Sequence, residues 1–543
     1  MKISIPPPPV RRTYEDALAA LQTLQLNSAI RTAIADAPQD TDPNRRAIPE
    51  MLEWARKAGY EAAELGNQGQ RYIHVAGTNG KGSVCVMVEN ILLQYRRAEV
   101  EGLKEARVGK IGLYTSPHLV TVRERIRIDG VSISESLFTH YFYELWDRFE
   151  TAASNGKNHD TGETQPGYFR YLTLLAIHVF RQEGVKTAIM ECGIGGEYDS
   201  TNILPANAVA VSAITRLGID HTSMLGGTIE EIAWHKGGIM KEGVPVFTMD
   251  QPSEALGVLE ERAAETGMEL NVVHRLPVLE TADFFLGLLG DFQSDNASLA
   301  TAVAASYLRG IGDTEGIPLH QELGNLVTVL PQQFEHGLET VTWPGRCEIR
   351  KDGNIEWFLD GAHTIESMEA VGRWFRTKMD EAHLEEQPPT ATMLIFNQDE
   401  RDGQALLQKL LLTMVSFEPP ASDIREAQNI RPIKPIRYLQ LFTYAAFCTN
   451  EPFTATNEGK NVNLKLQEGM AMLYQGLDGN ALHMVYGSVE EAVRLAMRVS
   501  EGDERVLVLV TGSLHLVGGL LQVLERGKEF LVEEPCDDEQ DLD

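Results

Sequence analysis

Short apolar runs alternate with longer segments of helical periodicity along the first part of the chain. Short apolar runs are typical of buried strands, whereas apolar residues spaced three and four apart are typical of helices. The expected strands are 72–76, 110–115, 186–190, 209–214 and 244–249. The expected helices are 83–95, 167–182 and 228–241. Buried strands that alternate with helices predict an α/β fold with a mostly parallel, doubly wound sheet.

The same pattern starts again after about residue 340 and predicts a second, smaller α/β domain. Its expected strands are 355–359, 392–396, 438–444 and 506–510. We therefore expect one domain over residues 1–338, including an N-terminal extension, and another over residues 339–543. The proline-rich segment 417–437 is expected to be a surface excursion, and the acidic tail 532–543 is expected to be disordered.

Composition indicates a large globular protein that does not bind nucleic acid. The chain has 543 residues, of which 43% are hydrophobic, so a sizeable core is available. Its 48 Lys and Arg residues stand against 78 Asp and Glu residues, which gives a net charge of −30. Nucleic acids and anionic membranes are bound through contacts between Lys or Arg and phosphate, so this charge disfavours both partners. Any anionic ligand must meet local cations, metal ions or helix N-termini.

Cysteine spacing indicates a reducing compartment, and the apolar segments favour neither a membrane span nor a secretory signal. The five cysteines lie far apart without a Cys-X-X-Cys pair, which disfavours disulfides and structural zinc. The most apolar stretch, 505–524, is interrupted by Thr, Ser, His and Gly, so we expect a strand, a turn and a helix instead of an integral membrane segment. The N-terminus lacks the apolar core of a secretory signal. Cytoplasm is the expected compartment and the mitochondrion the alternative, against which the proline run before Thr13 argues.

The segment GTNGKGS, residues 77–83, follows an expected strand and precedes an expected helix. It departs from a standard P-loop because Gly82 separates Lys81 from Ser83. Its glycines still allow the backbone to approach phosphates closely, and the start of a helix offers N–H groups to an anion. Lys81 can then meet the β- and γ-phosphates, and Ser83 can bind Mg²⁺. A glycine-rich turn with a surface lysine is the alternative interpretation.

Polar residues follow three further strands, where ligands of doubly wound sheets bind. Ser116 can give an oxygen to a metal, although Ser-Pro also marks ordinary turns. Glu191 suits Mg²⁺, which takes one or two protein carboxylates together with phosphate oxygens and water. His221 is a less natural Mg²⁺ ligand and is equally compatible with a structural role. Lys236 lies in a helical pattern and is expected, from that pattern alone, on the surface.

The segment GIGG, residues 193–196, resembles a dinucleotide-binding loop only weakly. Glu191 precedes it and would repel a pyrophosphate, and no clear helix opens at its third glycine. We therefore interpret the region as a loop that also contains Asp199 and Asn202.

The second domain offers three candidate nucleotide contacts. Arg346 lies in WPGR, and Asp360 and His363 follow an expected strand in DGAH. An aspartate can accept a hydrogen bond from a ribose hydroxyl, while Arg and His can meet phosphate charge. A surface salt bridge is the alternative for Arg346.

Nine segments, taken together, resemble the folylpolyglutamate synthase family, which is related to the Mur ligases. They occur in the family's order from Thr13 to Gly519 and span nearly the whole chain. The segments are TYEDALAALQTLQLN, GTNGKGS, TSPHL, ECGIGGEYDSTN, GIDH, HKGGIM, WPGRCE, LDGAHT and TGSLHLVGG. Most are weak singly, but the ordered set is highly specific, and its first segment resembles the eukaryotic branch.

The resemblance implies an ATP-dependent ligase with a P-loop-type ATPase domain and a second α/β domain. Such a ligase adds L-glutamate in γ-linkage to folates through an acyl phosphate. The residues implied to contact ATP are Thr78, Asn79, Gly80, Lys81, Gly82, Ser83, Asn296, Arg346, Asp360 and His363. The residues implied to bind Mg²⁺ are Ser83, Ser116, Glu191, His221 and Lys236, the lysine as a carbamate. Those implied to act in catalysis are Lys81, Lys236 and His363.

Partners and rivals follow from the same resemblance. The implied partners are reduced folate, folylpolyglutamates, L-glutamate and ATP, a monovalent cation is a further candidate, and a monomer is expected. Dihydrofolate synthase, or an enzyme with both activities, is the nearest alternative. A P-loop kinase or nucleotide switch is disfavoured because its lysine would directly precede Ser or Thr. A catalytically silent nucleotide-binding protein is disfavoured because no expected ligand is replaced.

Two positions depart from the bacterial members of the family. Phe292 stands where those members commonly have His, which puts the role of Asn296 in question. Thr364 stands where many of them have Asn, although eukaryotic members often have Thr.

Overall fold

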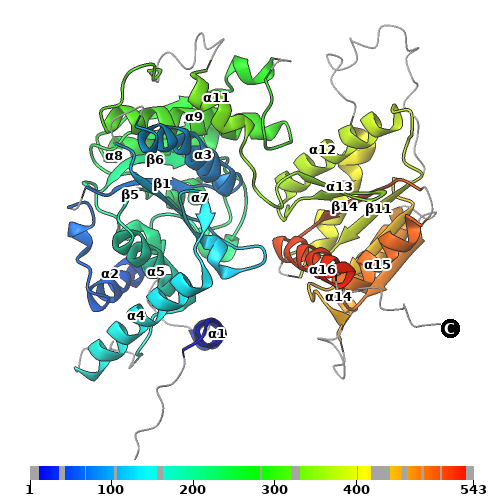
Figure 1. The fold of residues 1–543 in the computed structure, drawn as a ribbon, viewed down its shortest axis with the longest axis horizontal. Helices are drawn as coiled ribbons and strands as arrows, with labels where there is room; N and C mark the ends of the chain where they lie inside the picture. Colours follow the sequence, from blue (N-terminus) through cyan, green and yellow to red (C-terminus); the bar gives the residue numbers. More distant parts are fainter. Residues whose placement is uncertain are drawn as a thin grey trace, which may run out of the picture. The chain divides into compact units, whose positions relative to one another are not determined.

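Two α/β units, each with its own sheet, make up the computed structural model (Figure 1). The first unit comprises Met1–Leu286 and Ser294–Val341, and the second comprises Gly287–Gln293 and Thr342–Asp543. Residues 287–293, which the expected boundary leaves in the first domain, thus cluster with the second unit. The structure describes residues 12–35, 43–67, 69–102, 107–155, 163–281, 284–319, 330–399, 401–417, 441–454, 462–477, 482–501 and 504–532.

The first sheet has eight strands in the order β4-β3-β2-β5-β1-β6-β7-β8. The strands β2, β5, β1, β6, β7 and β8 run parallel, and β3 and β4 extend the sheet as an antiparallel edge. The predicted doubly wound α/β class is confirmed. The bounds are β1 Arg71–Ala76, β2 Lys110–Tyr114, β3 Ile126–Ile128, β4 Val131–Ser132, β5 Val185–Glu191, β6 Val209–Ile214, β7 Val246–Met249 and β8 Leu270–Val273.

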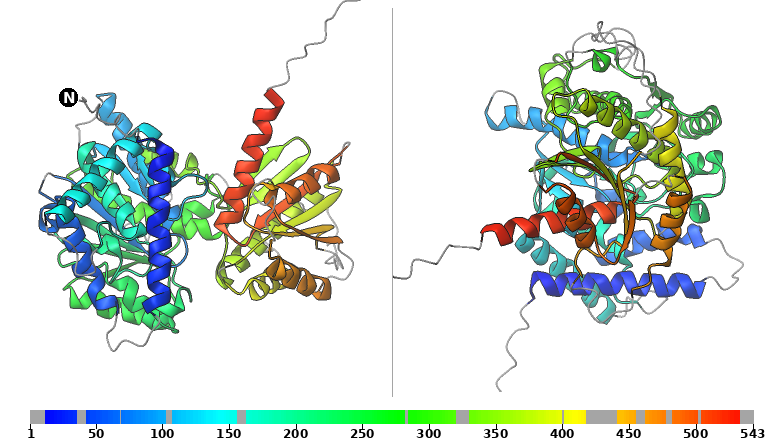
Figure 2. Two further views of the ribbon diagram at one scale, coloured as in Figure 1. Left: turned by 90° about the horizontal axis from the view of Figure 1, so that it is seen from below. Right: turned by 90° about the vertical axis from the view of Figure 1, so that its right-hand side faces the viewer.

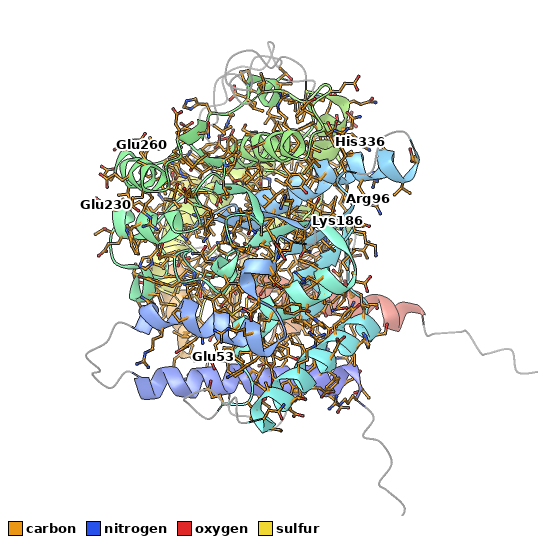
Figure 3. The ribbon with its side chains drawn as sticks, turned by 90° about the vertical axis from the view of Figure 1, so that its left-hand side faces the viewer. Glu53, Arg96, Lys186, Glu230, Glu260 and His336 are labelled. Carbon is orange, nitrogen blue, oxygen red and sulfur yellow. The ribbon has the colours of Figure 1, made fainter. Side chains whose placement is uncertain are left out.

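Helices cover both faces of the first sheet (Figure 1). One face carries α3 (Lys81–Val100), α9 (Phe292–Gly310) and α11 (Gln332–Glu339). The other carries α2 (Ala47–Lys57), α4 (Glu135–Ser154) and α5 (Tyr168–Gln182). Figure 3 shows Arg96 of α3 and His336 of α11 on the same side of the unit, as expected for two helices that pack against each other.

The central position of α5 follows from its sequence. Every side chain from Tyr171 to Phe180 is buried, so the helix is apolar on nearly all sides. A helix of that kind is stable only when it is covered all round. It packs against β5 and β2 on one side and against α1 (Tyr14–Ala35) and α4 on the other.

The second sheet has six strands in the order β13-β12-β11-β14-β10-β9. All are parallel except the edge strand β9. Helix α12 covers one face and α15 and α16 cover the other (Figure 1), and Figure 2 shows α16 as a long helix along this unit. The bounds are β9 Glu348–Asp352, β10 Ile355–Leu359, α12 Ile365–His383, β11 Ala391–Phe396, α13 Gly403–Ser416, β12 Tyr444–Cys448, α14 Lys465–Leu477, β13 Leu482–Tyr486, α15 Val489–Val499, β14 Val506–Thr511 and α16 Leu514–Val532.

One predicted strand, 438–444, is wrong. Residues 438–440 lie outside the described residues, and the strand begins at Tyr444. Leu441 and Phe442 are buried in the core of the unit but precede the strand. The strand itself contains Ala445 and Ala446, which have low strand propensity and enter the sheet because both of its faces are covered.

Among the element boundaries that differ from the predictions, two have a clear physical cause. Helix α7 (Ile229–Gly237) ends four residues before the expected end, at a pair of glycines. Strand β7 begins two residues later than expected, after Pro245, which has no N–H for a sheet. The expected excursion beyond Phe417 and the acidic tail beyond Val532 lie outside the described residues. None of the helices that the structure describes has the length and hydropathy to cross a membrane.

Candidate active site

Four neighbouring parallel strands bring the expected site segments of the first unit together. The strands β2, β5, β1 and β6 lie side by side, so their carboxyl ends share one edge of the sheet. These ends lead into Ser116, Glu191, the loop 77–80 and Asp220–His221 respectively. The backbone N–H of Ser116 donates to Glu191 Oε2 at 2.9 Å, so two of these ends are in direct contact. Ligands of doubly wound sheets bind at such an edge.

The glycine-rich loop is a tight turn between β1 and α3. Gly77 and Gly80 both have positive φ angles, of 149° and 88°, which favour glycine. A Cβ on Gly77 would strike the hydroxyl of Thr215. That hydroxyl donates to the carbonyl oxygen of Asn79 at 2.7 Å and so fixes the loop from the β6 side. Because α3 begins at Lys81, the loop presents the N-terminus of a long helix, which attracts anions.

Asn296 lies against this loop. A Cβ on Gly80 would strike its side-chain amide, and the asparagine is buried on α9. Asn296 therefore lies beside the glycine-rich loop within the first unit. The nearby residue Thr78 is held by its hydroxyl, which donates to the carbonyl oxygen of Gly218 at 3.0 Å. The loop is thus rigidly supported by segments that follow β6 and begin α9.

Two lysines converge on one carbonyl oxygen of the loop. Lys81 Nζ donates to the Gly77 oxygen at 3.0 Å, and Lys236 Nζ donates to the same oxygen at 2.8 Å. Only 3% of Lys236 is exposed, so the expectation that it lies on the surface is wrong. Burial, and next the charge of Lys81, lower the pKa of Lys236 to about 7. The uncharged amine is therefore much more accessible near neutral pH than for an ordinary lysine.

The oxygen donors at this edge fit a magnesium ion. Glu191 is 4% exposed at the end of β5, and Ser83 is buried in the first turn of α3. A buried carboxylate with nearby hydroxyls suits Mg²⁺, which completes its shell with phosphate oxygens and water. Among the described residues, no group of three or more His, Cys, Asp and Glu side chains could hold a metal. The residues expected to bind Mg²⁺ do not depend on such a group, because only Glu191 and His221 among them are of these types.

His221 occupies a strained position at the same edge. Its φ of 51° lies in the left-handed region, at the start of the short helix α6 (Thr222–Leu225). Its Nε2 lies 3.5 Å from Asp220 Oδ2, and 36% of the side chain is exposed. Asp220 also acts electrostatically on Lys236, so these residues share the neighbourhood of the loop. The imidazole beside a carboxylate can serve a metal or the structure of the turn.

The three candidate contacts of the second unit gather around Gly361. Asp360 is buried at the end of β10, and burial raises its pKa although Arg346 opposes this effect. His363 Nδ1 donates to the Gly361 carbonyl oxygen at 2.8 Å, which fixes the tautomer of the ring. A Cβ on Gly361 would come within 3.0 Å of the Arg346 guanidinium. The structure therefore brings an acid, a cation and an imidazole together within this unit.

Sequence reasoning missed the support that Cys347 gives to Asp360. The N–H of Cys347 donates to Asp360 Oδ2 at 2.8 Å, and the buried thiol also forms a hydrogen bond with this carboxylate. Cys347 has a φ of 45°, which is unusual for a residue other than glycine. In the sequence, only its position directly after Arg346 pointed to a role for Cys347 in this site.

Comparison with known proteins identifies the family. No family model matches the chain. Folylpolyglutamate synthase of Saccharomyces cerevisiae (strain FostersO) is 39% identical over 521 residues, which cover 95% of this chain and 88% of the yeast protein. The chain belongs to the folylpolyglutamate synthase family. Folylpolyglutamate synthase of Neurospora crassa is 38% identical over 530 residues, which cover 95% of this chain and 92% of that protein.

Solved structures of folylpolyglutamate synthases share the fold. The enzyme from Thermotoga maritima aligns with a TM-score of 0.62 at 22% identity, over 95% of this chain and 98% of that chain. The Mycobacterium tuberculosis enzyme, crystallised with ADP and AMPPCP, aligns with a TM-score of 0.62 at 19% identity, over 95% and 100% of the two chains. At these identities the likeness shows the fold alone, and the family resemblance is confirmed by the two fungal relatives.

Proposed function

We propose that this chain is an ATP-dependent ligase that joins L-glutamate to the γ-carboxylate of reduced folates and folylpolyglutamates. The observation that carries the proposal is the shared edge of β2, β5, β1 and β6. There a glycine-rich turn, a buried carboxylate and a buried lysine lie together. Relatives that match nearly the whole chain are folylpolyglutamate synthases, and a folylpolyglutamate synthase of similar fold was crystallised with AMPPCP and folate.

The reaction requires an activated acid because a carboxylate does not react with an amine unaided. A γ-carboxylate oxygen of the folate attacks the γ-phosphorus of ATP, the bond to the β-phosphate oxygen breaks, and ADP leaves. The amine of L-glutamate then attacks the acyl carbon, loses a proton, and phosphate leaves with the electron pair of the broken C–O bond. The first step brings two anions together, so it needs positive charge and aligned dipoles.

The loop and Lys81 can supply that stabilisation. The N-terminus of α3 directs a positive dipole toward the phosphates, and Lys81 adds a full charge beside the turn. In this structure Lys81 Nζ binds carbonyl oxygens of Gly77 and Thr78, 3.0 and 3.3 Å away. We propose that it exchanges these for phosphate oxygens when ATP binds. Thr78, Asn79, Gly80, Gly82 and Ser83 are the proposed backbone and hydroxyl contacts.

Magnesium would be held by Ser83, Ser116, Glu191, His221 and Lys236. When bound it would neutralise phosphate charge and polarise the transferred group. Lys236 can join this set only as an anion, and its chemistry allows that. An uncharged amine adds to carbon dioxide and releases a proton, which leaves a carbamate with two oxygens. The lowered pKa of Lys236 provides the uncharged amine near neutral pH.

The second unit would supply further ATP contacts. Asp360 is the proposed partner of the ribose, and Arg346 and His363 are the proposed partners of phosphate. Asn296 is the proposed contact from α9. L-glutamate as second substrate, a monomeric state, a cytoplasmic location and a role for a monovalent cation are parts of the same proposal.

The proposal is tested by two variants and a folate assay. We expect Lys81→Ala and Glu191→Ala to lower kcat for ligation by about 100-fold or more while the fold survives. Glu260→Ala, on the surface of α8 (Ser253–Glu265) and labelled in Figure 3, is the control and should be unchanged. The measurement is ADP release with ATP, L-glutamate and tetrahydrofolate, with products sized by mass. Near-normal turnover in either variant would refute its role.

The same assay separates the rival activities. Dihydropteroate as the preferred acceptor would indicate dihydrofolate synthase, and use of both acceptors would indicate a bifunctional enzyme. ADP release that does not require L-glutamate would indicate a kinase or a nucleotide switch.

A further inference from the structure

Two glycine pairs interlock beside Lys236. One pair is Gly195-Gly196, in the loop after β5, and the other is Gly237-Gly238, at the end of α7. A Cβ on Gly196 would lie 2.7 Å from the His235 carbonyl oxygen and 2.9 Å from that of Lys236. A Cβ on Gly238 would overlap the backbone of the neighbouring residue in the loop, Glu197. Gly196 and Gly238 are therefore each required by the close approach of the opposite segment.

Hydrogen bonds join the two segments across this contact. The N–H of Glu197 donates to the His235 carbonyl oxygen at 2.7 Å. Asn202 Nδ2 donates to the carbonyl oxygens of Glu197 and Gly238, at 3.0 and 3.1 Å. One asparagine side chain thus binds both segments at once. The backbone on either side of Lys236 is fixed by these contacts.

A buried aspartate fixes the loop itself. The carboxylate of Asp199 accepts the N–H groups of Gly193 and Ile194, both at 3.0 Å. It also accepts the N–H of Thr201 at 2.9 Å and the Thr201 hydroxyl at 2.6 Å. These four donors support the loop around a buried carboxylate, although burial still raises the pKa of Asp199.

An ion pair closes the contact from outside. Arg262 Nη2 of α8 lies 2.5 Å from Glu197 Oε2. The same guanidinium lies over the ring of Trp234, 4.8 Å from its centre. Because Trp234 precedes His235 on α7, this arginine ties the loop to the helix that carries Lys236.

We propose that loop 193–202 is a positioning element that fixes Lys236 at the Gly77 carbonyl oxygen. Asp199, Glu197 and Asn202 act as positioning residues that touch no substrate. The inference rests on the proposed function of Lys236. Its amine meets the Gly77 oxygen at 2.8 Å, and a shift of about 1 Å would take it beyond hydrogen-bonding distance. Gly196 of the GIGG segment therefore serves close packing against α7.

The test uses Gly238→Ala, which inserts a methyl group into the contact, and Asn202→Ala, which removes both side-chain bonds. Gly257→Ala on α8 is the matched control, because a Cβ there meets nothing within 4 Å. If Gly238→Ala does not fold, Asn202→Ala decides. Three quantities are measured on the full chain: kcat for ligation, the Kd of AMPPCP, and the rate of reductive methylation of Lys236, followed by mass spectrometry.

We expect kcat to fall about 10-fold or more, because small misplacements of a reacting group carry large kinetic costs. The Kd of AMPPCP should change by less than about 3-fold, and Lys236 should methylate several times faster than in the parent chain. Simple destabilisation would also speed the labelling of Lys57, whose side chain is 7% exposed, so only an increase confined to Lys236 supports the positioning role. Unchanged labelling together with kcat within about 2-fold of the control would overturn the proposal.

Lys236→Ala separates this inference from the function on which it rests. If that variant retains turnover, the assigned role of Lys236 is wrong and the loop positions nothing that the reaction uses. If it is inactive while Gly238→Ala and Asn202→Ala behave like the control, only the positioning role fails.

Discussion

At the scale of single residues, the environment of a side chain decides its chemistry. The sequence marked Glu191 and Lys81 as candidates because both stand next to predicted strand ends. The helical pattern alone placed Lys236 on the surface, since a lysine in such a pattern is usually solvated, and only the family resemblance marked it as a site residue. Its burial depends on contacts with a loop some forty residues earlier in the chain, and such long-range contacts leave no local pattern.

Glu89 shows the same dependence on environment away from the candidate site. It lies on α3, 3.1 Å from Arg127, and is almost fully buried. Burial raises its pKa to about 7, although Arg127 opposes the shift. The folded state therefore holds this proton more tightly than the unfolded chain, where the pKa is about 4.3. The resulting stabilisation is complete below that value and is lost as pH rises through about 7.

Glu89→Gln should therefore alter the pH dependence of stability. Glutamine cannot release a proton, so the stability of the variant does not fall in this way as the pH rises. Between pH 5 and pH 8, we expect the parent chain to lose about 2–3 kcal/mol in free energy of unfolding relative to the variant. Urea unfolding of both proteins at the two pH values gives the difference. Equal pH dependence would show that Glu89 titrates normally in the folded protein.

At the scale of elements, strands covered on both faces were the most predictable. The bounds of β6 and β10 agree with the predictions residue for residue, because both are short, mostly apolar runs that are interrupted by a single polar residue each, Ser212 and Glu356. Strand β12 was misplaced because its alanines carry little strand signal, while the aromatic segment before it carries more. Helix α7 was predicted too long, since periodicity continues beyond the glycines that end it.

Helix α7 is short, so its N-terminal cap should matter. Thr228 accepts the N–H of Glu231 at 3.3 Å, and Glu231 accepts the N–H of Thr228 at 3.1 Å, which forms a capping box. We expect Thr228→Ala to lower the free energy of unfolding by about 1 kcal/mol. Thr228→Ser keeps the hydroxyl and should lose much less, as measured by chemical denaturation. An equal loss in both variants would attribute the effect to the methyl group.

At the scale of the whole molecule, the division into units does not follow the order of the sequence. Residues 287–293 belong to the second unit, although residues on both sides of them belong to the first. Helix α9 begins in this segment at Phe292, whose ring packs against the core of the second unit. Hydrophobic patterns predicted both sheets but not this exchange, because seven residues carry too little periodicity to assign them to a core.

Phe292→Ala should therefore weaken the second unit and not the first. The lost packing should cost about 1–3 kcal/mol, because the ring is only partly buried. Hydrogen exchange should rise in β10 and β14 while β1 and β5 keep their protection. Phe285→Ala, a phenylalanine that is 63% exposed, is the control and should change neither unit. Loss of protection in β1 and β5 would place the ring in the other core.

The passage of the chain into the second unit and back has a consequence for recombination between related genes. A single crossover near residue 341 would join residues 1–341 of one parent to the C-terminal sheet of another. The residue at position 292, which packs against the second core, would then come from the first parent. In such a hybrid, the side chain at position 292 and the second core against which it packs come from different parents. Exchange of this unit between homologues should succeed when the heptapeptide at 287–293 travels with it, and otherwise only when the two parents agree there.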